Sequence, residues 1–147
     1  MLIVSTGYKR AILGPQSFPD IFNGGRIRIF AAPRPAAAEA PEPASALGDV
    51  VRYMFDTGLE FFQANEYIIK QNAHIWRFQA TSPGTALWFR LTAPGDDGQA
   101  SLTQPRMDGD IAVIGQPAEL SLVSTTIAAG DSILINSFNF TIPPLLG

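Results

Sequence analysis

The amino-acid sequence predicts a single all-β domain: an antiparallel β-sandwich or jelly-roll-like fold with a short N-terminal helical segment and a long Pro/Ala-rich loop. Its 147 residues are 46% hydrophobic and 16% charged, which is typical of one globular domain. From residue 47 onward, short runs of alternating apolar and polar residues predict about seven half-buried strands. Turn-forming residues separate these runs at intervals of about 8–12 positions, as they do in sandwiches and small barrels.

Residues 1–25 predict an N-terminal arm that contains the helical segment. A helix can begin at Thr6 and run to residue 13, where a Gly-Pro pair ends it. Proline lacks the amide hydrogen and disfavours a helical conformation in the preceding residue. A second short helical turn is predicted over residues 18–22, where Pro and Asp favour a helix start and an Asn-Gly-Gly run ends it.

Residues 26–30 give the clearest strand pattern, Arg-Ile-Arg-Ile-Phe. Successive side chains of a strand point to opposite faces. Ile27 and Ile29 therefore share one face, and Arg26 and Arg28 share the other.

Residues 31–46 read AAPRPAAAEAPEPASA and contain four of the twelve prolines. Prolines at this spacing prevent a regular strand ladder and favour an extended, polyproline-like chain. Because only a short arm and one strand precede this segment, we interpret it as a long loop inside one domain that spans residues 1–147, and not as a linker between two domains.

Five later segments show strand-like alternation. They are residues 51–55, 74–81, 87–91, 118–122 and a long final strand that ends before residue 143. The two strands on either side of Pro83 and Gly84 are interpreted as a hairpin. A helical turn is predicted around residues 59–66.

The final strand contains a change of phase. Ile133 and Ile135 are odd-numbered, whereas Phe138, Phe140 and Ile142 are even-numbered. A regular strand cannot place both sets on the same face. The sequence therefore predicts a β-bulge near residues 136–137, or a strand that is covered on both faces.

The composition argues against several classes of function. A formal net charge of −3 provides no basic surface for nucleic acid, and no apolar run is long enough to span a membrane. The chain has no cysteine, so thiolate metal sites and cysteine nucleophiles are absent. Basic residues follow the apolar start, which is the wrong order for a signal peptide, and we expect synthesis in the cytoplasm.

The candidate chemical sites are weak. The single histidine, His74, lies among aromatic residues and is expected to be packed or hydrogen-bonded. The runs at residues 96–98 and 108–110 could offer carboxylates to calcium, but Asp and Gly are also ordinary turn formers, and the spacing of an EF-hand is missing. No nucleophile elbow or phosphate-binding loop occurs. We therefore predict no enzymatic activity, no cofactor, no metal and no small-molecule substrate.

Aromatic and cationic residues occur together at Trp76, Arg77, Trp88 and Arg90. Such a mixture can bind a sugar or a single nucleic-acid strand. It is also typical of an ordinary sheet face that carries amphipathic side chains, and this second interpretation is preferred.

Both ends of the chain are apolar, at Leu2, Ile3 and Val4 and again over residues 142–146. Chain termini are usually polar and poorly ordered. Apolar ends indicate docking, either onto the chain's own core or onto a neighbouring subunit, and the sequence leaves both possibilities open.

Four segments resemble a group of small proteins encoded among the virion genes of tailed phages and prophages. They are residues 21–30 with the Pro/Ala-rich segment and Leu47-Gly48, residues 85–91, residues 118–131 without 123, and residues 135–143. The order and spacing of the segments carry the resemblance, which covers nearly the whole chain.

This resemblance implies a virion structural protein, and most closely a capsid cement (decoration) protein with a jelly-roll-like fold. Its expected partners are the major capsid protein and copies of itself as a homo-oligomer. A tail-tube, neck or head-completion protein is the first alternative, and a carbohydrate-binding module for host attachment is the second. The residues expected at the interface are Leu2, Ile3, Val4, Arg26, Arg28, Pro33, Arg34, Pro35, Pro143, Pro144, Leu145 and Leu146.

Overall fold

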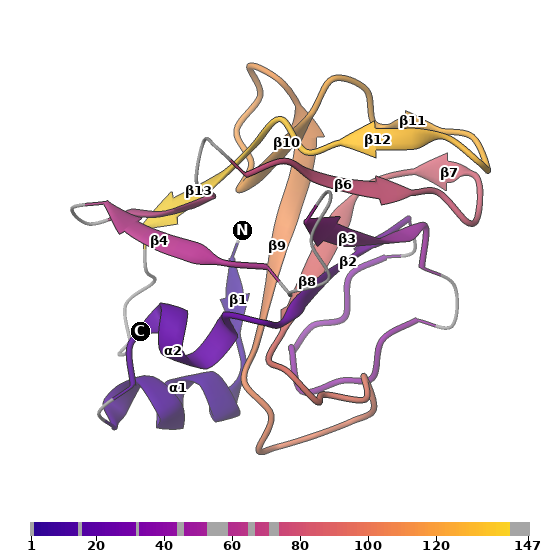
Figure 1. The fold of residues 1–147 in the computed structure, drawn as a ribbon. Helices are drawn as coiled ribbons and strands as arrows, with labels where there is room; N and C mark the ends of the chain where they lie inside the picture. The colour runs from indigo at the N-terminus through magenta and orange to yellow at the C-terminus, as the bar shows by residue number, and fades with distance from the viewer. Residues whose placement is uncertain are drawn as a thin grey trace.

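A computed structural model of the 147-residue chain describes residues 2–14, 16–31, 33–43, 46–52, 59–64, 67–70 and 74–141 (Figure 1). The chain is mostly β, with two short helices and a curled, mixed sheet. The helices are α1 (Thr6–Leu13) and α2 (Phe18–Phe22). The strands of the described residues are β1 (Ile3–Val4), β2 (Arg26–Phe30), β3 (Gly48–Arg52), β4 (Phe61–Ala64), β5 (Tyr67–Lys70), β6 (Trp76–Gln79), β7 (Gly84–Thr85), β8 (Trp88–Thr92), β9 (Arg106–Val113), β10 (Leu120–Leu122), β11 (Thr126–Ile127), β12 (Ser132–Leu134) and β13 (Ser137–Thr141).

The main sheet has eleven strands in the order β12-β6-β3-β2-β8-β9-β10-β13-β5-β4, with β1 paired to β9 beside this path. The β9–β10 pair is parallel, and the other pairs of described strands in this sheet are antiparallel. In Figure 1, β8 and β9 lie along the middle of the molecule, while β4, β6 and β12 run roughly crosswise to them, which shows how strongly the sheet curls. The predicted two-sheet sandwich or jelly roll is not confirmed, because hydrogen bonding continues through the described strands from β12 to β4.

Both predicted helices are confirmed at the predicted bounds. The Ser5 hydroxyl accepts a hydrogen bond from the Tyr8 N–H and caps α1. At α2, Ser17 and Asp20 form a capping box, in which each side chain accepts the other's backbone N–H. Each cap satisfies an amide that has no partner inside its helix.

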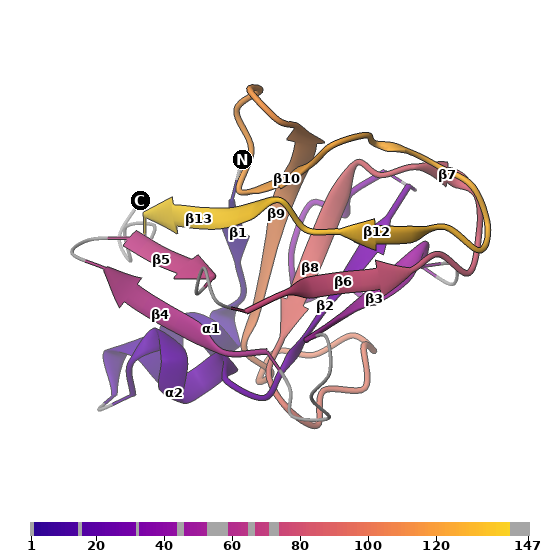
Figure 2. The ribbon, with the colours of Figure 1, turned by 45° about the horizontal axis from the view of Figure 1, so that its top comes forward.

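One cluster of buried apolar side chains fills the inside of the curl, and α1 and α2 cover it on one side (Figure 2). Phe138 lies at its centre, with ring centroids 5.3–5.7 Å from those of Phe61, Trp76, Phe89 and Phe140. Ile27 and Ile29 enter the same core, as the strand pattern predicts. Burial of one such side chain contributes roughly 1.5–3 kcal/mol.

Two local predictions are wrong. The hairpin around residues 83 and 84 does not form, because β6 pairs with β3 and β12 while β8 pairs with β2 and β9. The short strand β7 lies between them and pairs with β11 instead. The helical turn predicted around residues 59–66 is strand β4, in which Phe61 is buried and Phe62 is exposed.

The predicted long final strand is divided in two. β12 pairs with β6, whereas β13 pairs with β10 and β5, so the chain passes from one part of the sheet to another at residues 135 and 136. This interruption takes the place of a bulge: it buries Ile135 as well as Phe138 and Phe140. Residues 53–58, to which part of the predicted 51–55 strand belongs, lie outside the described residues.

Candidate functional site: a charged face and an uncharged rim

Strands β2, β8 and β9 carry their charged side chains on the face opposite the core. Register places Arg28 opposite Arg90, and Arg90 opposite Asp108. The neighbouring row places Arg26 opposite Thr92, and Thr92 opposite Arg106. Directly opposite residues share a sheet face, so several guanidinium groups gather on one surface.

Arg90 and Asp108 form a bidentate ion pair inside the protein. The Arg90 Nε and Nη2 atoms donate to the two carboxylate oxygens at 2.7 and 2.9 Å, and neither side chain is exposed. Burial raises the pKa of the Asp108 carboxyl, and the hydrogen bonds from Arg90 oppose that rise. The Arg90 guanidinium also lies 5.7 Å from the ring centroid of Trp88, which itself stacks on Phe30.

Arg106 and Asp96 form a second buried bidentate pair, with N–O distances of 2.7 and 2.8 Å. The remaining Arg106 donors bond the backbone carbonyls of Ala38, Ala40 and Gln99. Burial works to raise the pKa of Asp96, but hydrogen bonds from Arg106 and from the Gly98 N–H outweigh it and lower that pKa. A buried charge is tolerated only when it is paired and hydrogen-bonded in this way.

Arginine side chains of the sheet bond residues 33–43, the described part of the Pro/Ala-rich segment. We name residues 33–43 the strap. The strap contains neither helix nor strand. Arg90 and Arg106 both donate to the Ala40 carbonyl, and Arg28 donates to Glu42 at 2.8 Å. Arg34, within the strap, bonds Asp110 at 3.2 Å. A segment without regular structure is thus bonded to the sheet through side chains.

Glu39 links the strap to helix α1. Its Oε1 accepts from the Thr6 N–H at 2.6 Å and from the Thr6 hydroxyl at 2.7 Å. The first turn of α1 contains no acidic residue of its own. The strap therefore supplies the negative charge that a helix N-terminus favours.

The residues expected at an interface are divided between three environments. Leu2 and Val4 pack against the core, and β1 pairs with β9 of the same chain. Arg28 and Arg34 bond carboxylates of the same chain. Pro33 is exposed, Pro35 and Arg26 are half-buried, and Pro143, Pro144, Leu145 and Leu146 lie outside the described residues.

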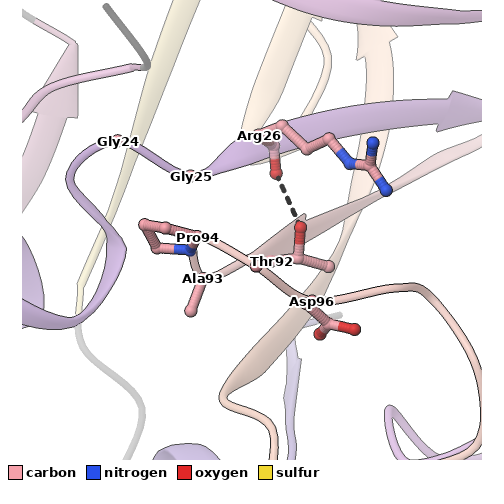
Figure 3. Close-up of a pocket in the computed structure, with 8 residues that line it drawn as sticks. Gly24, Gly25, Arg26, Thr92, Ala93, Pro94 and Asp96 are labelled. Atoms are coloured by element: carbon pink, nitrogen blue, oxygen red, sulfur yellow. Dashed lines mark hydrogen bonds between the residues drawn. The ribbon is translucent and has the colours of Figure 1, made fainter.

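A hollow of about 270 Å³ lies beside this charged face (Figure 3). Backbone at Gly24 and Gly25 lines one side, and residues 92–96 line the other. The Arg26 side chain extends away from Gly24 and Pro94 in Figure 3, and its carbonyl accepts the Thr92 hydroxyl at 3.5 Å. The Asp96 carboxylate is committed to Arg106. The hollow therefore presents mainly backbone and proline carbons.

No family model, no curated protein and no solved structure matches this chain. Its function must therefore be argued from its own residues.

Three of the four candidate calcium ligands, Asp96, Asp108 and Asp110, each bond an arginine, and the fourth, Asp97, accepts the Gln99 N–H at 3.0 Å. Within the described ranges, no group of three or more His, Cys, Asp or Glu residues could hold a metal ion. No helix in that part of the chain is long and apolar enough to cross a membrane. The backbone carbonyl of His74 accepts a hydrogen bond from the Lys70 ammonium at 2.7 Å.

Trp76 and Trp88, the residues proposed for sugar stacking, are both buried. A ring that stacks on a sugar must offer an exposed face. Trp76 lies in the apolar core, whereas Trp88 stacks on Phe30 near the Arg90 guanidinium. The four aromatic and cationic residues therefore do not form one exposed surface, and the carbohydrate-binding alternative loses its basis.

Strand patterns in the sequence do not reveal a further surface, the uncharged rim, which we define as residues 86–87, 111–114 and 122–125. Backbone hydrogen bonds join these segments, from Ala86 N–H to Thr125 O, from Ile111 N–H to Leu87 O and from Ile114 N–H to Leu122 O. Four large apolar side chains of the rim are exposed, namely Leu87, Val113, Ile114 and Val123. A signal was present: residues 81–89, 111–118 and 120–130 contain no charged residue.

Proposed function

We propose that this chain is a capsid cement protein of a tailed phage, which binds the major capsid protein and stabilises the head. The observation that carries the proposal is the exposure of large apolar side chains at both ends of β9. Leu102, which is 69% exposed, precedes the strand, whereas Ile114 and Val123, which are 52% and 77% exposed, lie at its far end. Exposed apolar surface of this kind marks sites of protein–protein contact.

Two contact surfaces on one body are what a bridging protein requires. The eight residues of β9 separate the two ends by about 26 Å at 3.3 Å per residue. Weak contacts at each end become strong when symmetry repeats them over a shell. The internal ion pairs support this role, because a rigid body loses less conformational entropy when it binds.

The resemblance to phage virion proteins supports a location in the phage head and a structural role without an enzymatic reaction. The same proposal includes the expectation that the curled sheet of this chain is similar to the jelly-roll-like sheets of cement proteins.

Co-sedimentation tests the proposal directly. Purified chain is mixed with shells assembled from the major capsid protein of the same genome, and the bound fraction is measured after sedimentation. We expect saturable binding at hundreds of copies per shell, whereas a neck or head-completion protein would be present at about a dozen copies. Absence of saturable binding, together with absence of density for the chain in cryo-electron microscopy of the virion, would refute the proposal.

A matched pair of variants connects the binding to the exposed ends. Leu102→Asp should reduce shell binding, because it places a charge in an apolar contact. Leu13→Asp alters another exposed leucine, at the end of α1, and should leave binding unchanged. A chain that lacks residues 143–147 tests the predicted docking of the C-terminus, which should weaken attachment more than folding.

A further inference from the structure

We propose that the uncharged rim is a self-association surface, through which two copies of this chain bind each other about a two-fold axis. The proposal rests on the proposed function only for its place in a capsid, since the pairing itself concerns the purified chain. It assigns one end of β9 to a second copy and leaves the end at Leu102 for another partner.

The first argument is geometric. Register pairs Leu122 with Val113 at the end of the parallel β9–β10 ladder, and the next residue, Ile114, donates its N–H to the Leu122 carbonyl at 3.0 Å. This hydrogen bond joins the backbone at Ile114 to the residue that precedes Val123, so the two exposed side chains extend from neighbouring segments. Leu87 adjoins these segments through the hydrogen bond between its carbonyl and Ile111.

The second argument is electrostatic. Each copy carries a formal net charge of −3, so two copies repel each other at long range, and an uncharged contact surface adds no close contacts between like charges to this repulsion. A two-fold contact brings each residue near its own counterpart or near a shared partner, which makes like charges costly. The rim segments contain no charged residue. Glu119, which lies between two of them, turns back into its own chain and accepts the Asp110 N–H at 3.0 Å.

The third argument is hydrogen-bonding chemistry. Ser124 and Thr126 are exposed and flank the half-buried Thr125, and the Ser124 hydroxyl bonds the Thr126 backbone within its own chain. A hydroxyl is both donor and acceptor, so a hydroxyl-bearing surface can bond to an identical surface. Carboxylates, which only accept, and ammonium groups, which only donate, cannot do this. Apolar side chains bordered by hydroxyl groups are therefore self-complementary.

The opposite end of β9 differs from the rim because it carries a charged residue. The loop before β9 carries Leu102 but also the exposed Asp97. A two-fold contact there would bring acidic groups together. The rim is thus the better of the two exposed ends for a second copy.

Sedimentation equilibrium over a range of concentrations tests the pairing. Wild-type chain should show a reversible monomer–dimer equilibrium, and Ile114→Asp and Val123→Asp should each weaken it at least about 100-fold, which corresponds to ~2.7 kcal/mol. Leu102→Asp is the matched control, because it makes the same change at the other end and should leave the equilibrium unchanged. A wild-type chain that stays monomeric, or a Leu102→Asp variant that dissociates equally, would overturn the proposal.

A cross-linking experiment does not depend on how the charged variants fold. The natural chain has no cysteine, so Val123→Cys introduces a single thiol. Mild oxidation should convert Val123→Cys into a disulfide-linked dimer much faster than Leu102→Cys. Equal rates would contradict the assignment of the rim. If the Val123→Asp variant is monomeric but still sediments with shells, both proposals stand. If the wild-type chain forms dimers that never bind shells, only the capsid proposal is refuted.

Discussion

Removal of the Arg106 guanidinium should destabilise the fold strongly. Arg106→Met retains most of the side-chain length, but it leaves the buried Asp96 carboxylate without its bidentate partner. It also removes the donor for carbonyls in the strap and in the loop before β9. Loss of one partner from a buried ion pair costs about 3–5 kcal/mol. Small domains have only about 5–15 kcal/mol of stability in total, so the effect is easily measured.

Urea denaturation followed by tryptophan fluorescence provides the measurement, because Trp76 and Trp88 are both buried and report loss of the core. Asp96→Asn and the Arg106→Met/Asp96→Asn double variant complete a mutant cycle. The double variant should cost about 2 kcal/mol less than the sum of the single variants, since it leaves no buried charge. Arg34→Met is the control: its ion pair is partly exposed on both sides and should contribute less than about 1 kcal/mol.

Two results would refute this reasoning. A loss below about 1 kcal/mol for Arg106→Met would mean that the pair contributes no more than a surface ion pair does. An additive cycle would mean that the two charges do not depend on each other.

Three further changes test the fold. The Tyr8 hydroxyl is buried without a hydrogen-bond partner among the described residues, and burial raises its pKa from 10.0 to about 12. The unfolded chain therefore loses this proton first, and stability falls by up to about 2.7 kcal/mol as the pH rises from 10 to 12; urea titrations should show Tyr8→Phe lacking that loss. Glu39→Gln should lower the free energy of unfolding by about 0.5–1 kcal/mol at neutral pH, because the amide lacks the charge that α1 favours. Burial opposes ionisation of Glu39, but hydrogen bonds from α1 outweigh it and lower its pKa, so the difference from wild type should shrink as the pH falls below the ordinary range of a Glu carboxyl and through this lowered pKa, as denaturation at a series of pH values from 7 downward will show. Gly109→Ala would place a methyl group 2.5 Å from the Phe89 ring and should cost about 1–3 kcal/mol by thermal unfolding, whereas Gly14→Ala, with its nearest contact at 3.4 Å, should be nearly neutral.

Local patterns in the sequence predict the parts of this fold that depend on neighbouring residues. Both helices end where glycine and proline predict, and the alternation at residues 26–30 identifies which face of β2 is buried. The same alternation places Trp76 and Phe78 in the core. Each of these features follows from side chains within a few positions of one another.

Pairing between distant segments could not be predicted in this way. β6 and β8 are close in the sequence, with only the short strand β7 between them, yet β3 and β2 separate them in the sheet. A strand pattern specifies faces but not partners. The phase change in the last strand did indicate that something interrupts it, and the interruption is a transfer from β6 to β10 and β5.

In the candidate site too, the sequence predicts which face a side chain occupies but not which distant residues it contacts. Arg28 was predicted on the face opposite Ile27 and Ile29, and it lies there, but its bonds to Glu42 and Asp49 depend on long-range packing. The alternation of β8 predicted that Trp88 and Arg90 share a face, yet it could not show that this face is covered. Coverage comes from the strap, whose composition alone indicates an exposed loop.

The distribution of charge connects the fold with the proposed function. The chain contains only ten basic residues, and Arg28, Arg34, Arg90 and Arg106 bond carboxylates of the same chain. The stretches that form the rim receive no charge at all. Apolar side chains exposed on an uncharged surface favour association through shape and hydrophobic contact, which salt screens little. Self-association through the rim should therefore persist in high salt. An association governed by surface ion pairs would weaken instead, and this comparison separates the two mechanisms without any variant.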